Sequence, residues 1–143
     1  MTLNLNETEI AEVFGDNDPR RHETEAQQRW GNTDAYKESS RRTSSYSKED
    51  WQRIQEQTAA NVQQFVTAMQ SRLAAASVEA MDAAEAHRLL ISEFYYDCNY
   101  QIHTGLAEMY VADERFAAHY NNYAAGLAQY ISEAIHANAI ARS

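Results

Sequence analysis

The chain has 143 residues and a mass of 16.3 kDa, enough for one domain with a hydrophobic core but too little for two full domains. Its formal net charge of −9 opposes contact with nucleic acid or an anionic membrane, and no apolar run approaches the roughly 18 residues of a membrane-spanning helix. The single cysteine excludes an internal disulfide, and the N-terminus lacks the basic and apolar segments of a signal peptide, so we expect a cytoplasmic protein.

The first third of the chain predicts three short helices, over residues 3–14, 19–30 and about 34–40. Gly15 ends the first, because glycine adopts the left-handed C-terminal cap conformation without strain, and the second stops at Gly31. Asp18–Pro19 reads as an N-cap followed by a first helical residue, and Thr33 reads as the cap of the third helix.

Residues 1–46 are poor in large apolar side chains. They contain 9 of them in 46 positions, against 30 in the 97 positions that follow. Burial of so few apolar side chains offsets only weakly the conformational entropy that the segment loses when it becomes ordered. We therefore expect a mobile or loosely docked N-terminal segment over residues 1–46 and a packed core over residues 47–143.

The core begins with a capping box of Ser47 and Asp50, followed by a long amphipathic helix. Its apolar stripe advances in steps of three and four residues through Trp51, Ile54, Thr58, Val62, Phe65, Met69 and Leu73.

A second stripe follows the predicted N-cap Ser77 and runs through Ala80, Ala84, His87, Ile91, Phe94, Cys98, Ile102, Gly105 and Met109. This pattern fits one long helix, or two helices with a bend near residues 97–100, where Asp and Asn favour caps.

Two more helices complete the pattern. Asp113 is the expected cap of a helix with Phe116 and Tyr120, and the final stripe holds Tyr123, Leu127, Tyr130, Ala134 and Ile135. No strand-like alternation occurs, so the sequence predicts an all-α fold with five helices after Ser47 packed around one core.

Catalytic and metal-binding motifs are absent from the sequence. Glu133 and His136 have a Glu-x-x-His spacing, but a di-metal site in a helical bundle needs two such pairs. His87 and Cys98 lie about 16 Å apart on a straight helix, too far for a catalytic dyad. We expect neither an enzyme nor a cofactor or metal.

Aromatic side chains gather between residues 94 and 110: Phe94, Tyr95, Tyr96, Tyr100 and Tyr110. Tyrosine combines an apolar ring with a polar tip, so this cluster suits a large, flat, partly polar ligand. The same residues also fit an ordinary bundle core with tyrosines at its rim.

Longer strings are more specific than these patterns. They are VFGD at 13–16, RWGNTDAY at 29–36, SKEDWQRIQ at 47–55, MDAAE at 81–85, YDCNY at 96–100, His103–Thr104, EMYV at 108–111 and DERF at 113–116. In this order they resemble, over essentially the whole chain, the antibiotic-recognition domains of the TipAS type found in thiostrepton-induced regulators of the MerR family.

The resemblance implies a globin-like helical domain without haem that binds a thiopeptide antibiotic or a similar large cyclic ligand. It also implies an N-terminal segment that folds over the bound drug. In such regulators only a separate N-terminal MerR-type domain contacts DNA. Because this chain starts with methionine and has no helix-turn-helix segment, we expect it to match the short form that sequesters drug, although a role within a longer transcriptional activator remains open.

Gly105 departs from the family pattern. The cysteine that attaches the drug in the family, by adding its thiolate to a dehydroamino acid of the antibiotic, falls on this position. Glycine supplies no sulfur, so we expect reversible binding. Cys98 is expected to be a buried structural cysteine, with a role as alternative nucleophile the less favoured interpretation.

We expect the ligand to contact residues on the second stripe and one aromatic residue of the N-terminal segment: Trp30, His87, Ile91, Phe94, Tyr95, Cys98, Ile102, Gly105 and Met109. In this hypothesis Trp30 closes over a ligand held by a monomeric domain. The alternative is a homo-oligomerising helical module whose aromatic stripe is an interface.

Overall fold

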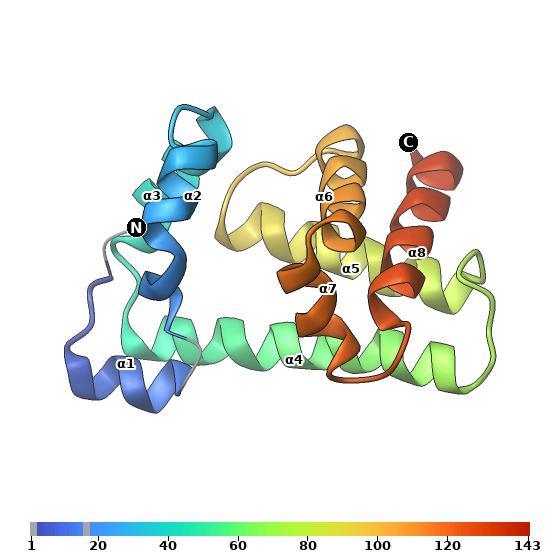
Figure 1. Cartoon of the computed structure of the whole chain (residues 1–143), viewed down its shortest axis with the longest axis horizontal. Helices are drawn as coiled ribbons and strands as arrows, with labels where there is room; N and C mark the ends of the chain where they lie inside the picture. Colours follow the sequence, from blue (N-terminus) through green and yellow to red (C-terminus); the bar gives the residue numbers. More distant parts are fainter. Residues whose placement is uncertain (1–2, 16–17) are drawn as a thin grey trace. The chain divides into compact units, whose positions relative to one another are not determined.

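Helices account for all the regular structure among residues 3–15 and 18–143, which are the residues that the computed structural model describes (Figure 1). In chain order they are α1 Glu7–Phe14, the 3-10 helix η1 Pro19–His22, α2 Glu23–Trp30, α3 Asp34–Thr43, α4 Lys48–Gln70, α5 Val78–Phe94, α6 Tyr100–Ala112, α7 Glu114–Asn121 and α8 Leu127–Arg142. No strand occurs in these described residues, so the predicted all-α class is confirmed. None of these helices is long and apolar enough to span a membrane.

Most helix starts follow from local side-chain hydrogen bonds. The Ser47 hydroxyl accepts from the Asp50 amide at 3.1 Å, while the Asp50 carboxylate accepts from the Ser47 amide at 2.9 Å, which is the predicted capping box. Thr33, Ser77 and Asp113 also cap the helices expected from the sequence.

The first helix is shorter than predicted. It begins at Glu7 rather than Leu3, because Asn6 forms a capping box with Glu9 at 2.8 and 3.0 Å and so fixes the helix start. Gly15 ends the helix with φ 57° and ψ −123°, a positive-φ conformation outside the left-handed helical region that we predicted. The predicted second helix divides into η1 and α2, with Asp18 capping the 3-10 turn.

Two compact units divide the chain, and each is described by itself. The first comprises Met1–Gln57 and Ile91–Asp97, and the second comprises Thr58–Leu90 and Cys98–Ser143. Both α4 and α5 contribute residues to the two units.

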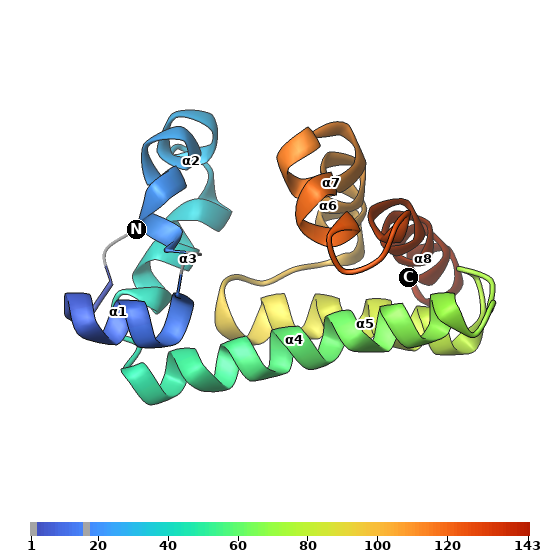
Figure 2. The same cartoon turned by 60° about the horizontal axis from the view of Figure 1, so that its bottom comes forward.

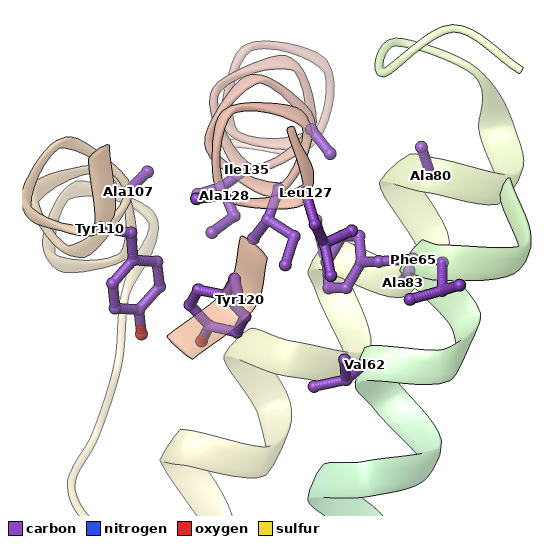
Figure 3. Packing of buried hydrophobic residues seen from close by; sticks show 14 residues of the cluster. Val62, Phe65, Ala80, Ala83, Ala107, Tyr110, Tyr120, Leu127, Ala128 and Ile135 are labelled. Atoms are coloured by element: carbon purple, nitrogen blue, oxygen red, sulfur yellow. The ribbon is translucent and has the colours of Figure 1, made fainter. Parts of the chain in front are cut away.

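The core of the second unit lies where α8 packs against α6 and α7 (Figure 2). Its apolar side chains come from five helices: Val62, Phe65, Val66, Ala80, Ala83, Ala84, Ala107, Tyr110, Tyr120, Leu127, Ala128, Ile131, Ala134 and Ile135 (Figure 3). Tyr110 and Tyr120 lie side by side with ring centroids 5.2 Å apart, and their hydroxyls point to the same side. The five helices predicted after Ser47 thus form, and all contribute to this core.

Several residues of the predicted stripes lie outside the core, among them the exposed Ile102 and Gly105 of α6. Thr58 lies on an exposed stretch of α4 over residues 56–60, and Leu73 follows the end of α4 at Gln70. Tyr123 is 53% exposed because it precedes the first residue of α8.

Aromatic contacts hold the first unit together. The Trp51 ring, 3% exposed, packs edge-on against Phe14 at 5.2 Å and against Tyr46 at 5.6 Å. Among the described residues up to Tyr46, only Ile10, Phe14 and Thr43 are buried, and α2 buries none. The expected scarcity of burial in the N-terminal segment is therefore present, while its mobility stays a prediction.

Candidate functional site

The connection between α5 and α6 decides between the one-helix and two-helix interpretations of the second stripe. α5 ends at Phe94 and α6 begins at Tyr100, where the Asn99 side chain caps the helix by accepting from the Ile102 amide at 2.8 Å. Cys98 lies in this connection and is not helical. The two-helix interpretation is therefore confirmed, and the three- and four-residue spacing continues through a connection that is not a helix.

A polar network in the second unit centres on Glu85 of α5. Its carboxylate accepts from Arg88 at 2.6 and 3.1 Å, from the Tyr100 hydroxyl at 3.2 Å and from the Asn138 amide of α8 at 3.0 Å. The hydrogen bond from Arg88 is the main cause that lowers the pKa of Glu85 to about 2. The carboxylate is thus charged at neutral pH and joins three helices.

Arg88 also fastens the connection that follows α5. Its guanidinium donates to the carbonyl oxygen of Cys98 at 2.9 Å and lies 4.3 Å from the centroid of the Tyr100 ring. Because the same guanidinium holds Glu85, the backbone at Cys98 and the start of α6 are fixed relative to α5.

Glu85→Gln is expected to destabilise the protein by about 2 kcal/mol at pH 7, because a hydrogen bond to a charged partner contributes about this much. The pKa of Glu85 is lowered from 4.5 to about 2 in the folded protein, so its stabilisation is complete above pH 4.5 and is lost as the pH falls toward 2. Urea unfolding of variant and wild type at pH 7 and pH 3 measures this. Glu56→Gln, at an exposed position of α4, is the matched control. The prediction would be contradicted if Glu85→Gln and wild type differed in unfolding free energy by the same amount at pH 7 and at pH 3.

Two histidines on different helices form a close pair in the same unit. Nδ1 of His87 on α5 lies 2.8 Å from Nε2 of His103 on α6, and the rings stack at 5.1 Å. His103 is fully buried, whereas His87 is partly exposed. Burial lowers the pKa of His87 to about 4 and that of His103 to about 3, so both rings are neutral at pH 7.

The Cys98 thiol is shielded. The residue is 2% exposed, its Sγ lies 3.7 Å from the carbonyl oxygen of Asn99, and burial raises the pKa of the thiol to about 11. Since the thiolate is the nucleophilic form, a thiol with this pKa reacts poorly at neutral pH.

Gly105, by contrast, faces open space on α6. A Cβ atom built there meets no heavy atom within 4 Å, and its φ lies outside the positive range that restricts other residues. Ile102, three residues earlier, is 37% exposed, and Met109, four residues later, packs partly against the core. α6 therefore has an open face at Gly105 on which a side chain fits without displacing its neighbours.

Of the nine residues expected to bind ligand, His87, Cys98, Ile102, Gly105 and Met109 belong to the second unit. In the first unit, Phe94 is buried and accepts the Tyr46 hydroxyl at its carbonyl oxygen. Tyr95 directly follows Phe94 and Ile91 precedes it by three residues, and both are partly buried. Trp30 is partly buried with the Arg29 guanidinium 4.5 Å from the centroid of its ring. Their contact with a ligand stays a prediction.

Sequence reasoning missed the partners that orient these residues. Glu85 and His103 were noted only within family strings, and Arg88 and Asn138 were not singled out. Their decisive hydrogen bonds reach other helices or the connection after α5, and sequence spacing does not indicate such contacts. No group of three or more potential ligands for a metal occurs in the described residues, and Glu133, the acidic member of the Glu-x-x-His pair, is exposed.

The chain is similar to known proteins over most of its length. The profile of the TipAS antibiotic-recognition domain matches residues 22–138. The chain is 51% identical over 140 residues to the HTH-type transcriptional activator TipA of Streptomyces coelicolor, covering 98% of this chain and 55% of the activator. It is 37% identical to the HTH-type transcriptional activator mta of Bacillus subtilis over 98 residues, 68% of this chain and 37% of that protein.

Two solved structures are similar as well. TipAS of Streptomyces lividans in complex with nosiheptide, from a thiopeptide antibiotic multidrug resistance system, superposes with a TM-score of 0.90 at 50% identity and covers 99% of each chain. The antibiotic-binding domain of a TipA-class multidrug resistance transcriptional regulator has a TM-score of 0.60 at 46% identity and covers 65% of this chain and 99% of its own. The first match supports the helical, globin-like fold that the family resemblance implies.

Proposed function

The chain belongs to the TipAS antibiotic-recognition domain family, and from this premise we propose that it binds antibiotics of the thiopeptide class. The observation that carries the proposal is the likeness, over 99% of both chains, to TipAS in complex with nosiheptide. At 50% identity and a TM-score of 0.90, nearly the whole fold of that drug-bound protein has a structural counterpart here.

Binding is reversible in this proposal. Gly105 has no sulfur to add to a dehydroamino acid, and the thiol of Cys98 is buried with a pKa raised to about 11. The open face of α6 then offers contact area to the drug rather than a covalent bond.

The nine residues predicted to contact ligand remain part of the proposal, together with the ordering of residues 1–46 on binding. The low burial of residues 1–46 supports their ordering on binding. No residue of α2 is buried in the protein, and a bound ligand supplies an apolar surface for α2 to pack against. A folding step of this kind couples occupancy to a large conformational signal.

The chain spans about half the length of the curated relatives it matches, 55% in the case of TipA. We propose that it senses the drug for a transcriptional activator when joined to a separate DNA-binding domain, or sequesters drug when alone. In either setting it acts as a monomeric cytoplasmic domain that makes no DNA contact of its own, as its net charge of −9 favours.

Titration with nosiheptide followed by amide NMR tests the proposal. We expect slow-exchange shifts in α5 and α6, new or sharpened amide signals from residues 1–46, and an intact mass under denaturing conditions equal to that of the free chain. Unchanged spectra at a drug concentration well above micromolar would overturn the assignment to thiopeptides.

A further inference from the structure

His87 and His103 share one hydrogen bond, and this limits which protons the two rings carry. Both are neutral, so each ring has one N–H and one bare nitrogen. Nδ1 of His87 and Nε2 of His103 are 2.8 Å apart, so one of these atoms donates and the other accepts.

The buried environment of His103 selects the donor. Its Nδ1 is buried without a hydrogen-bond partner in the described part of the chain. If His87 donated to His103, the proton of His103 would sit on this Nδ1 and become a buried N–H without an acceptor, an arrangement that folded proteins avoid. If His103 donates from Nε2, no buried N–H is left unpaired. His103 is therefore the donor and Nδ1 of His87 the acceptor.

The direction of this hydrogen bond determines which nitrogen of His87 carries the proton. A neutral His87 that accepts at Nδ1 must carry its proton on Nε2. No hydrogen bond to this Nε2 is formed by residues 3–15 or 18–143, and the atom is not among the fully buried polar atoms that lack a partner, in a residue that is itself partly exposed.

We infer that His103 locks His87 in the Nε2–H form, so that His87 donates a hydrogen bond to an acceptor atom of the bound antibiotic, an amide carbonyl oxygen or an azole nitrogen. The inference rests on the proposed function. His103 acts as a positioning residue, and His87 contacts the ligand. The lowered pKa of both rings agrees with a neutral pair, and the nearby charges of Arg88 and Glu85 affect His103 in opposite directions.

The tautomer is measured directly in the free protein, with no substitution that risks misfolding. Long-range proton–nitrogen correlation spectra at pH 7 are expected to show protonated Nε2 and bare Nδ1 nitrogens in both His87 and His103. Protonated Nδ1 in His87 would overturn the inference, whatever the protein binds.

Binding variants test the donated hydrogen bond. Relative to wild type, His87→Phe is expected to weaken nosiheptide binding about fivefold, the effect of losing one neutral hydrogen bond, while His87→Gln, whose amide N–H replaces the donor, stays within about twofold. His119→Gln, at an exposed position on α7, is the control. Equal loss in both His87 variants, or no loss in either, would overturn the inference and leave the proposed function standing. Failure of the wild type to bind nosiheptide would overturn the proposed function and the ligand-directed half of the inference.

Discussion

Gly105→Cys is expected to convert the proposed reversible binding of a thiopeptide into covalent capture of the drug. The new side chain projects into open space on α6, since a Cβ there has no neighbour within 4 Å, and the fold therefore accommodates it without repacking. An exposed thiol keeps a pKa of about 8.5, so a useful fraction is thiolate near pH 8. The thiolate adds across the carbon–carbon double bond of a dehydroamino acid, and the adjacent carbon takes up a proton, so no group leaves.

Intact mass spectrometry under denaturing conditions, after incubation with thiostrepton, checks this expectation. The variant is expected to gain the mass of one whole drug molecule, while the wild type gains none. Cys98→Ser in both backgrounds is the control, because it removes the only other thiol. A wild-type adduct that disappears with Cys98→Ser would identify Cys98 as the nucleophile and contradict reversible binding, whereas a folded Gly105→Cys variant without an adduct would show that α6 does not present this position to the drug.

Helix starts were predictable because their signals are local. Thr33, Ser47, Ser77 and Asp113 each bond to an amide two or three residues further along the chain, so the residue type and its position suffice. The same reasoning applies to Asn6, whose pairing with Glu9 was overlooked in the sequence and shortens α1 by four residues from the predicted start.

Contacts between helices were not predictable in this way. The His87–His103 pair spans 16 residues and the Glu85–Asn138 hydrogen bond spans 53, and no periodicity relates positions on different helices. The stripe through Cys98 misleads in a different way. Its regular spacing continues across the connection between α5 and α6, although Asn99 and its neighbours make this connection non-helical. The family resemblance, carried by long strings rather than periodicity, indicated the fold and the ligand class, but it did not indicate which side chains orient one another.

Phe65→Ala is expected to cause a large loss of stability, about 4 kcal/mol. The Phe65 ring of α4 is 1% exposed and lies in the apolar cluster with Leu127 and Ile131 of α8, so its removal deletes buried apolar surface and leaves a cavity at the centre of the second unit (Figure 3). Urea unfolding monitored by far-UV circular dichroism measures the effect as a lower midpoint with an unchanged slope.

Thr58→Ala on the same helix is the matched control, because sequence periodicity treats positions 58 and 65 alike while the structure separates them. Thr58 is exposed, so its truncation removes no buried contact, and alanine has the higher helix propensity. We expect a change within about 0.5 kcal/mol of wild type. A loss at Thr58 comparable to the loss at Phe65 would mean that the exposed turn of α4 is covered in solution, and that the apolar stripe of α4 is buried along its whole length, as the sequence alone predicts.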